Sequence, residues 1–338
     1  MAVPPWNIYS TGADKAWALL PQPTAGKIDW GRVRVAHLDT GYTHHEVFFP
    51  QGPQGRSSII LARLGRDFLQ PRRGTALDPL KKTVLQDPGH GTRSGSALSA
   101  DNARLTGVAP GLPLVPYRVT DTSLVTGKVA EAIGKSINHV VENRIAPVVS
   151  ISLGFPLVAD RDMGRAVDRA YEAGVIVVAA AGQVIDRVTY PGKHRRTICA
   201  AGIRFRRRRY SLYQKYDHYG RIDCWAPADP IQVARFPPAN HYGKSDGTTY
   251  AAVHVAAAAA MWVRFHGAAA LRQAYPQGWQ RIEAFRMLLN ASGKSAPFLD
   301  KLPTNAAKRL DIEALLQAPL PDKTLLRYET DFARDDAA

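Results

Sequence analysis

Cysteines, long apolar runs and export signals are scarce or missing in this chain, and each absence excludes a class of protein. Only Cys199 and Cys224 occur among 338 residues, and both stand in apolar segments. Two such thiols suit a reducing compartment better than a disulfide framework, although a bridge between them is left open. The longest apolar candidate for a membrane span, residues 251–263, is too short and contains His254. No transmembrane helix is therefore predicted.

The first residues of the chain carry no export signal. The segment MAVPPWNIYSTGADKAW has no basic start, no apolar core and no small-residue cleavage site, which are the three parts of a secretory signal peptide. We therefore expect a cytoplasmic protein that does not engage a membrane.

Acidic residues are outnumbered by basic ones. There are 44 Lys and Arg against 29 Asp and Glu, which gives a formal net charge of +15. Five of the six residues from Arg204 to Arg209 are Arg. Two interpretations of this run stay open: a solvated basic loop, or a surface that docks an acidic partner. Nucleic acid is the less favoured partner, because Phe205, Tyr210 and Tyr213 are not interleaved as regularly as in a single-strand platform.

Apolar, β-branched segments alternate with longer segments of helical character over most of the chain. The predicted strands are 31–38, 114–119, 148–153, 175–180 and 197–201, and the predicted helices are 129–143, 161–173 and one beginning near residue 249. This alternation predicts an α/β fold whose mostly parallel central sheet lies between layers of helices. Residues 48–84 are expected to be irregular. We expect one domain over residues 1–316 and a peripheral tail over 317–338.

Three glycine-containing motifs place a reactive side chain at a predicted turn or helix start. Asp39 lies in LDTGY, His90 in DPGHGTRSGS and Thr249 in SDGTTYAAVHVAAAAA. Glycine permits the sharp turns and close backbone approach that a site admitting a substrate chain requires. The order acid, imidazole, hydroxyl is one arrangement of a nucleophilic triad, in which the imidazole takes the hydroxyl proton and the carboxylate fixes its tautomer.

These motifs and their order resemble the subtilisin-like (subtilase, S8-type) serine protease family. The resemblance extends from about residue 5 to residue 262 and is specific because several motifs occur in the family's order. The matching segments are Asp39-Thr40-Gly41, His90-Gly91-Thr92, Gly107-Val108-Ala109-Pro110, Ser152-Leu153-Gly154, Ala180-Ala181-Gly182 and Tyr190-Pro191-Gly192.

The resemblance implies a three-layer subtilisin-like fold and a peptidase or acyl hydrolase that acts on a polypeptide. Asp39 would orient His90, and His90 would transfer the proton of the nucleophile. Thr249 stands where the family has its nucleophilic serine, between the flanks GT and YAAVHV. Gln183 stands where the family has the asparagine that donates to the oxyanion. Both departures keep the chemical group: Thr249 adds a methyl group beside the hydroxyl, and Gln183 carries the amide on a longer arm.

Four further residues are implied to bind the substrate. Ser152, Leu153 and Gly154 resemble the strand that lines the family's substrate groove. Phe155 follows where a further glycine is common, and it would narrow the pocket for the residue before the scissile bond. The altered nucleophile and pocket suggest a narrow substrate range.

Threonine at position 249 leaves two functions open. In the first, Thr249 is an active nucleophile, handicapped because its methyl group stiffens χ1 and crowds the reacting atoms. In the second, the chain is a pseudoprotease that binds a peptide or regulates a partner without turnover. A threonine with a purely structural role at a helix start also fits this pattern.

No metal site is predicted. His44, His45 and Glu46 are consecutive, so the two imidazoles point to different faces, and no further spaced ligand supports zinc. Many relatives bind calcium through loop carboxylates and carbonyls, so calcium stays open as a cofactor, but no acidic loop identifies its site.

Relatives usually carry a prodomain, whereas residues 5–19 already resemble the start of a mature enzyme. We therefore expect no prodomain here.

Overall fold

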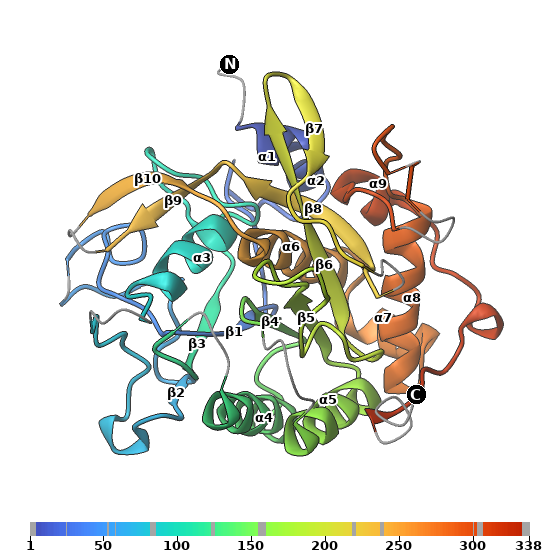
Figure 1. Cartoon of the computed structure of the whole chain (residues 1–338). Coiled ribbons are helices and arrows are strands. Elements are labelled where there is room, and N and C mark those ends of the chain that lie inside the picture. Colours follow the sequence, from blue (N-terminus) through green and yellow to red (C-terminus); the bar gives the residue numbers. More distant parts are fainter. Residues whose placement is uncertain are drawn as a thin grey trace.

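A sheet of eight strands lies at the centre of the computed structural model (Figure 1). The structure describes residues 5–24, 26–52, 54–57, 59–81, 86–122, 126–154, 160–217, 221–236, 240–299, 301–302 and 307–332. The strands of the sheet are β1 (Val35–Asp39), β2 (Arg66–Asp67), β3 (Leu114–Arg118), β4 (Val148–Ile151), β5 (Ile176–Ala180), β6 (Ile198–Arg206), β7 (Arg209–Leu212) and β8 (Cys224–Asp229).

The sheet is parallel except at one edge. Its order is β2-β3-β1-β4-β5-β6-β7, and β8 also pairs with β6. All of these pairs are parallel apart from β6 with β7, which form an antiparallel hairpin. A second antiparallel pair, β9 (Ile231–Arg235) and β10 (His241–Ser245), lies outside the sheet. The carboxyl ends of β1, β4 and β5 therefore meet at one edge.

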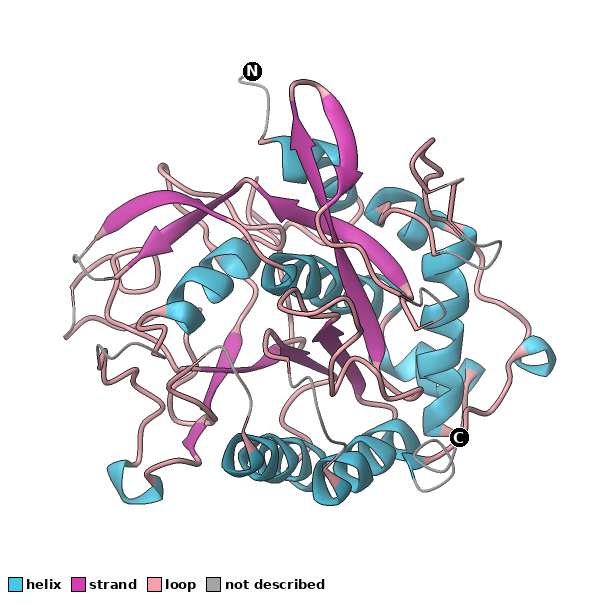
Figure 2. Cartoon of the chain, in the orientation of Figure 1, coloured by secondary structure: helices cyan, strands magenta, loops and turns pink. Residues whose placement is uncertain are grey.

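Helices cover both faces of the sheet, as Figure 2 shows. One face carries α3 (His90–Ser99) and α6 (Thr248–His266), and the other carries α4 (Gly127–Glu142) and α5 (Arg161–Ala173). The remaining elements lie around this three-layer body. They are α1 (Trp6–Ser10), α2 (Ala13–Ala18), η1 (Pro71–Arg73), α7 (Ala268–Ala274), α8 (Gly278–Ala291), α9 (Ile312–Gln317) and η2 (Lys323–Leu325).

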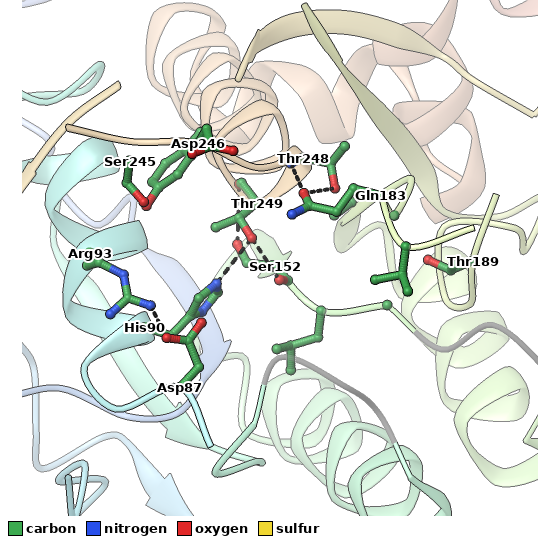
Figure 3. Close-up of a pocket in the computed structure, with 16 residues that line it drawn as sticks. Asp87, His90, Arg93, Ser152, Gln183, Thr189, Ser245, Asp246, Thr248 and Thr249 are labelled. Carbon is green, nitrogen blue, oxygen red and sulfur yellow. Dashed lines mark hydrogen bonds and ion pairs between the residues drawn. The ribbon is translucent and has the colours of Figure 1, made fainter. Parts of the chain in front are cut away.

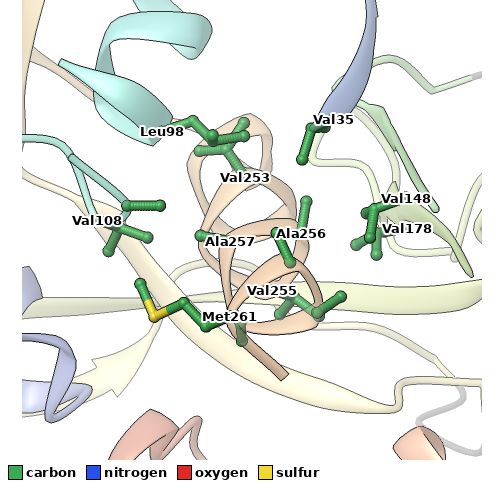
Figure 4. Close-up of a cluster of buried hydrophobic side chains, with 14 of the residues drawn as sticks. Val35, Leu98, Val108, Val148, Val178, Val253, Val255, Ala256, Ala257 and Met261 are labelled. Atoms are coloured by element: carbon green, nitrogen blue, oxygen red, sulfur yellow. The ribbon is translucent and has the colours of Figure 1, made fainter. Parts of the chain in front are cut away.

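The period of two in the strands explains why both faces are buried. In β4, Val148 belongs to the apolar cluster under α6, and Val149 belongs to the cluster under α4 and α5. Successive strand residues point to opposite faces, so a run of apolar residues is needed when helices cover both. Helix α6 crosses the middle of the first cluster. In Figure 4 its Ala256 faces Val148 and Val178 of the sheet, whereas Val253 lies beside Leu98 of α3. Its run of small alanines lets the helix lie close to the strands.

Several of the strands in the sheet and of the helices that cover it were predicted from the sequence. The helix predicted over 161–173 is α5, and the strands predicted over 114–119 and 175–180 match β3 and β5 to within one residue at each end. The hairpins β6–β7 and β9–β10 and the helix α8 were not predicted. Residues 48–81 are largely irregular in the parts that the structure describes, as expected.

The loop interpretation of the arginine run is wrong. Residues 204–206 end β6 and residue 209 begins β7, so only Arg207 and Arg208 form the turn. The two strands pair from Ile203 with Leu212 to Arg206 with Arg209. Aromatic rings at Phe205 and Tyr210 lie 4.8 Å apart across this pair. Cross-strand aromatic contacts stabilise hairpins, which explains why a highly charged segment is extended here.

The end of the chain follows the surface of α5. Tyr328 and Glu329 contact Tyr171 and Arg196, and Phe332 is buried against His194. The division at residue 316 stays a prediction.

Both cysteines are buried free thiols, so Cys199 and Cys224 do not form a disulfide bond. No helix among the described residues is long and apolar enough to cross a membrane.

Candidate active site

Three elements bring Asp39, His90 and Thr249 together at the carboxyl edge of the sheet. Asp39 is the last residue of β1, His90 is the first residue of α3 and Thr249 lies in the first turn of α6. The Nδ1 atom of His90 is 2.7 Å from Oδ1 of Asp39, and its Nε2 atom is 3.2 Å from Oγ1 of Thr249. The three residues singled out in the sequence therefore form one hydrogen-bonded chain.

Asp39 is held in its ionised form. Its Oδ1 atom accepts a hydrogen bond of 2.7 Å from the Thr40 backbone N–H, and its Oδ2 atom accepts one of 2.9 Å from the Ser94 hydroxyl. Burial on its own raises the pKa of this carboxyl, but the adjacent His90 and its hydrogen bond outweigh burial and lower the pKa of Asp39 to about 2. The carboxylate can therefore orient His90 over a wide pH range.

His90 has the tautomer and proton affinity of a general base. Burial lowers the pKa of its ring, but the Asp39 carboxylate has the opposite effect, and the pKa is raised overall. Since the carboxylate can only accept, Nδ1 carries the hydrogen and Nε2 is left to take a proton from Thr249. This arrangement suits proton transfer at neutral pH.

The Thr249 hydroxyl faces two acceptors. Besides His90, it lies 3.2 Å from the Ser152 backbone carbonyl and donates to it. A hydroxyl has one proton to donate, so the bond to Ser152 competes with the bond to His90. The residue is 9% exposed, and a substrate carbonyl would have to approach through this narrow opening.

Gln183 is fixed by the start of α6. Its side-chain oxygen accepts a hydrogen bond of 2.6 Å from the Thr248 backbone N–H, which leaves the amide NH₂ group on the side facing Thr249 (Figure 3). The preceding Gly247 has φ +146°, and a Cβ there would lie 3.1 Å from the Gln183 oxygen. Glycine is therefore required at this turn. The Thr248 and Tyr250 backbone N–H groups already donate to Gln183 and Gly247. The Gln183 NH₂ group and the Thr249 backbone N–H are therefore the donors that could face an oxyanion.

The pocket beside Thr249 is small. Its volume is about 150 Å³, and its lining includes Ser152, Leu153 and Gly154, whose role in substrate binding stays a prediction. Phe155 lies outside the described residues. Thr189 stands between two glycines of the walls, because a Cβ on Gly154 would be 2.4 Å from its Oγ1 atom and a Cβ on Gly182 would be 2.6 Å from it. Thr189 therefore occupies space that the two glycines leave open.

Sequence reasoning missed two side chains behind the triad. The hydroxyl of Ser94 lies 2.9 Å from Nε2 of His37, and that nitrogen is 3.7 Å from Oδ2 of Asp39. Burial lowers the pKa of His37, so the ring is neutral beside the carboxylate. A signal was present in the sequence: His37 precedes Asp39 by two in a strand, and Ser94 follows His90 by four in a helix, and both spacings place residues on one face.

No metal centre is evident where the structure is described. Groups of three or more His, Cys, Asp or Glu that could hold an ion do not occur among those residues. The ring of His45 lies 3.0 Å from the His241 carbonyl through Nε2 and accepts from the Val47 N–H through Nδ1, which explains the pair of histidines by local packing. The prediction about calcium stays open.

Comparisons with known proteins agree with this geometry. The model of the subtilase family matches residues 31–303. The chain belongs to the subtilase family. It is 29% identical over 320 residues to the major intracellular serine protease of Bacillus subtilis (strain 168), an alignment that covers 91% of this chain and 88% of that protein. Subtilisin E from the same organism is 31% identical over 206 residues, which are 59% of this chain and 52% of subtilisin E.

Solved structures confirm the subtilisin-like fold. Fervidolysin from Fervidobacterium pennivorans, a keratinolytic enzyme related to subtilisin, superposes with a TM-score of 0.68 at 19% identity over 94% of this chain and 46% of that chain. A protease from Pseudoalteromonas arctica PAMC 21717 gives the same TM-score at 22% identity over 92% of this chain and 96% of that one. The predicted three-layer α/β fold is therefore correct.

Proposed function

We propose that this subtilase hydrolyses peptide bonds with Thr249 as its nucleophile. The observation that carries the proposal is the continuous chain from Asp39 through His90 to Thr249, with gaps of 2.7 and 3.2 Å. A hydroxyl within hydrogen-bond reach of an oriented imidazole is the arrangement that activates a nucleophile. Subtilase membership supports a polypeptide substrate.

Each residue has one task in the proposed reaction. Oγ1 of Thr249 attacks the substrate carbonyl carbon, and its proton passes to Nε2 of His90. The negative charge on the carbonyl oxygen is stabilised by the Gln183 amide and the Thr249 backbone N–H. His90 then protonates the leaving amine as the C–N bond breaks. Water, deprotonated by His90, attacks the acyl carbon, the bond to Oγ1 of Thr249 breaks, and His90 returns its proton to Oγ1. Asp39 keeps the imidazole in place throughout.

The second candidate function is a pseudoprotease that retains the groove without turnover. The bond from the Thr249 hydroxyl to the Ser152 carbonyl favours it, because a proton directed at that carbonyl is not available to His90. In this case the chain would bind a peptide or regulate a partner.

A comparison of three proteins tests both candidates: the native chain, Thr249→Ser and Thr249→Ala, each assayed with an activated ester and a peptide library. If Thr249 is the nucleophile, Ala abolishes native activity, and Ser raises kcat by about tenfold to 100-fold because the reacting oxygen is released from the methyl constraint. Native protein indistinguishable from Ala, with activity only in Ser, would establish the pseudoprotease instead.

We further propose a narrow substrate range. The pocket of about 150 Å³ is smaller than the roughly 300 to 1,000 Å³ of typical ligand pockets. Thr189 fills the space between Gly154 and Gly182, so a small side chain before the scissile bond fits best. We therefore propose that Thr189 narrows the pocket for the side chain before the scissile bond, an effect that the sequence analysis assigned to Phe155.

Two finer proposals concern location and partners. A cytoplasmic location is supported by the likeness to a protease named as intracellular and by two free thiols.

An acidic partner that binds the β6–β7 hairpin is supported by the exposed turn of that hairpin. Arg206 pairs with Asp229 at 2.8 Å, whereas no carboxylate among the described residues pairs with Arg207 or Arg208. Added polyglutamate should bind the native chain, and Arg207→Gln with Arg208→Gln should abolish that binding.

A further inference from the structure

A second, larger cavity lies at the opposite edge of the sheet from the triad. Its volume is about 930 Å³, and residues that precede β1, β4 and β5 line it together with the end of α6 and with α7. Thr249 and Trp262 stand near opposite ends of α6, roughly 20 Å apart at 1.5 Å per residue. The cavity is therefore separate from the proposed active site, and the inference below does not depend on that site's activity.

The charge around this cavity has one sign. Five guanidinium groups line it, and no Asp or Glu occurs in its lining among the residues that the structure describes. The five residues are Arg32, Arg34, Arg144, Arg272 and Arg281. Burial and the neighbouring charge of Arg272 lower the pKa of Arg281, which is the effect expected when like charges are gathered without a counter-ion.

The inner wall is apolar and contains polar hydrogens without acceptors. Val33, Ile145, Ile176 and Leu271 are buried residues that line the cavity. Trp262 is fully buried in the same wall, and its indole N–H has no hydrogen-bond partner in the part of the chain that the structure describes. The indole nitrogen is itself enclosed, so this wall offers a ligand apolar surface.

One of the five arginines, Arg281, has a structural role at the end of a helix. The guanidinium of Arg281 donates to the carbonyls of Tyr275 and Ala173, and Ala173 is the last residue of α5, where a cation offsets the helix dipole. Arg144 and Arg272 are exposed, and their side chains have neither a hydrogen bond nor an ion pair within the described ranges. Their charges are therefore available to a ligand.

We propose that this cavity binds a small organic anion with an apolar body, of the class of a medium-chain carboxylate. The guanidinium groups would hold the carboxylate, because arginine forms paired hydrogen bonds with carboxylates. The aliphatic chain would lie on the wall formed by Val33, Ile145 and Leu271, where its methylene groups would be removed from water. The combination of an apolar wall with unpaired cations favours such a ligand over a polyanion, which needs charge but no apolar cavity.

Calorimetry with sodium octanoate and with 1-octanol at fixed ionic strength tests the proposal. The variants are the double substitution Arg144→Gln with Arg272→Gln, the matched double substitution Arg161→Gln with Arg165→Gln at exposed positions of α5, and Trp262→Phe. The first two remove the same charge from exposed sites, so the charge of the whole molecule is controlled.

We expect octanoate to bind and to raise Tm with concentration, and 1-octanol to bind at least about tenfold more weakly. The Arg144/Arg272 substitutions should weaken octanoate binding by about tenfold or more, whereas the matched α5 substitutions should change it less than about twofold. Trp262→Phe keeps an apolar ring in the wall and should change octanoate binding less than about twofold. Equal binding of octanoate and 1-octanol, or equal losses in the two double variants, would overturn the proposal. A single-stranded oligonucleotide that binds through Arg144 and Arg272 while octanoate does not would assign the cavity to a polyanion.

Discussion

At the scale of single residues, the methyl group of Thr249 decides how the hydroxyl is shared. Threonine has few χ1 states because two heavy atoms branch at Cβ. In the observed state the hydroxyl is 3.2 Å from both His90 and the Ser152 carbonyl. A serine could rotate away from the carbonyl at little cost, whereas Thr249 can do so only by moving its methyl group within a buried site.

Thr189 is predicted to set the size of the accepted side chain. Thr189→Gly should raise kcat/KM for peptides with Phe before the scissile bond relative to Ala by about 10-fold to 100-fold, because it opens the space beside Gly154 and Gly182. The isosteric control Thr189→Val keeps the volume and should keep the native preference. Peptide competition assays measure the ratio, and an unchanged Phe-to-Ala ratio in the glycine variant would contradict this assignment.

Activity is predicted to fall in acid with the protonation of His90. In the proposed reaction the neutral ring is the base, and its pKa is raised above 6.5, so kcat/KM should decline at a higher pH than an ordinary histidine would give. Asp39→Asn removes the charge that raises this pKa, and burial then dominates, so the His90 pKa should fall below 6.5. NMR titration of the His90 ring measures both values.

The same shift has a stability consequence of known sign. A pKa raised on folding means that the folded state binds the proton more tightly, so His90 stabilises the fold below about pH 6.5 and loses that contribution as pH rises through its folded pKa. In the native chain this part of the free energy of unfolding should therefore decrease towards alkaline pH. Asp39→Asn should abolish this decrease in the free energy of unfolding. An unaltered pH dependence would show that the Asp39 charge does not raise the His90 pKa.

At the scale of elements, the β6–β7 hairpin combines stable strands with a strained turn. Arg207 and Arg208 have φ of +49° and +62°, a region that Asn and Gly adopt at less cost than Arg. Replacing Arg207 by Asn and Arg208 by Gly should raise the free energy of unfolding by about 1 kcal/mol. Urea unfolding measures it.

Lysine at the same two positions serves as the control for the hairpin. Arg207→Lys with Arg208→Lys keeps the charge and the strain, so the urea midpoint should stay within error of the native value. If the Asn-Gly variant is no more stable than the lysine variant, the turn is not strained.

At the scale of the whole molecule, the end of the chain is predicted to stabilise the fold without affecting catalysis. Phe332 is 7% exposed and its ring lies 5.2 Å from that of His194, so Phe332→Ala should lower the free energy of unfolding by about 3 kcal/mol. Leu325, which is 59% exposed, is the control, and its change to Ala should cost less than about 0.5 kcal/mol.

Both variants should keep native kcat, because Phe332 packs on Gly164 and Asp168 of α5 and does not line the pocket at Thr249. Thermal or urea unfolding together with a peptidase assay separates the two effects. A loss of kcat with unchanged stability in Phe332→Ala would contradict this division.

Local pattern predicted much of the fold because its causes are local. Apolar runs that alternate with helical segments specify parallel strands and covering helices, and α5 was predicted with its observed limits. The hairpin at 204–212 was not predicted, because its run of charged residues is typical of a solvent-exposed loop. Its strands are stabilised by cross-strand contacts, such as that of Phe205 with Tyr210, which the local pattern does not contain.

The sequence by itself determined the order of Asp39, His90 and Thr249, their glycine-rich surroundings and the departures at Thr249 and Gln183, because each is a property of neighbouring residues. Only the tertiary structure decided that Thr189 fills the gap between two distant glycines and that arginines from separate segments converge on one cavity. Such contacts join residues far apart in the chain, and they depend on how the layers pack rather than on any spacing that can be read along it.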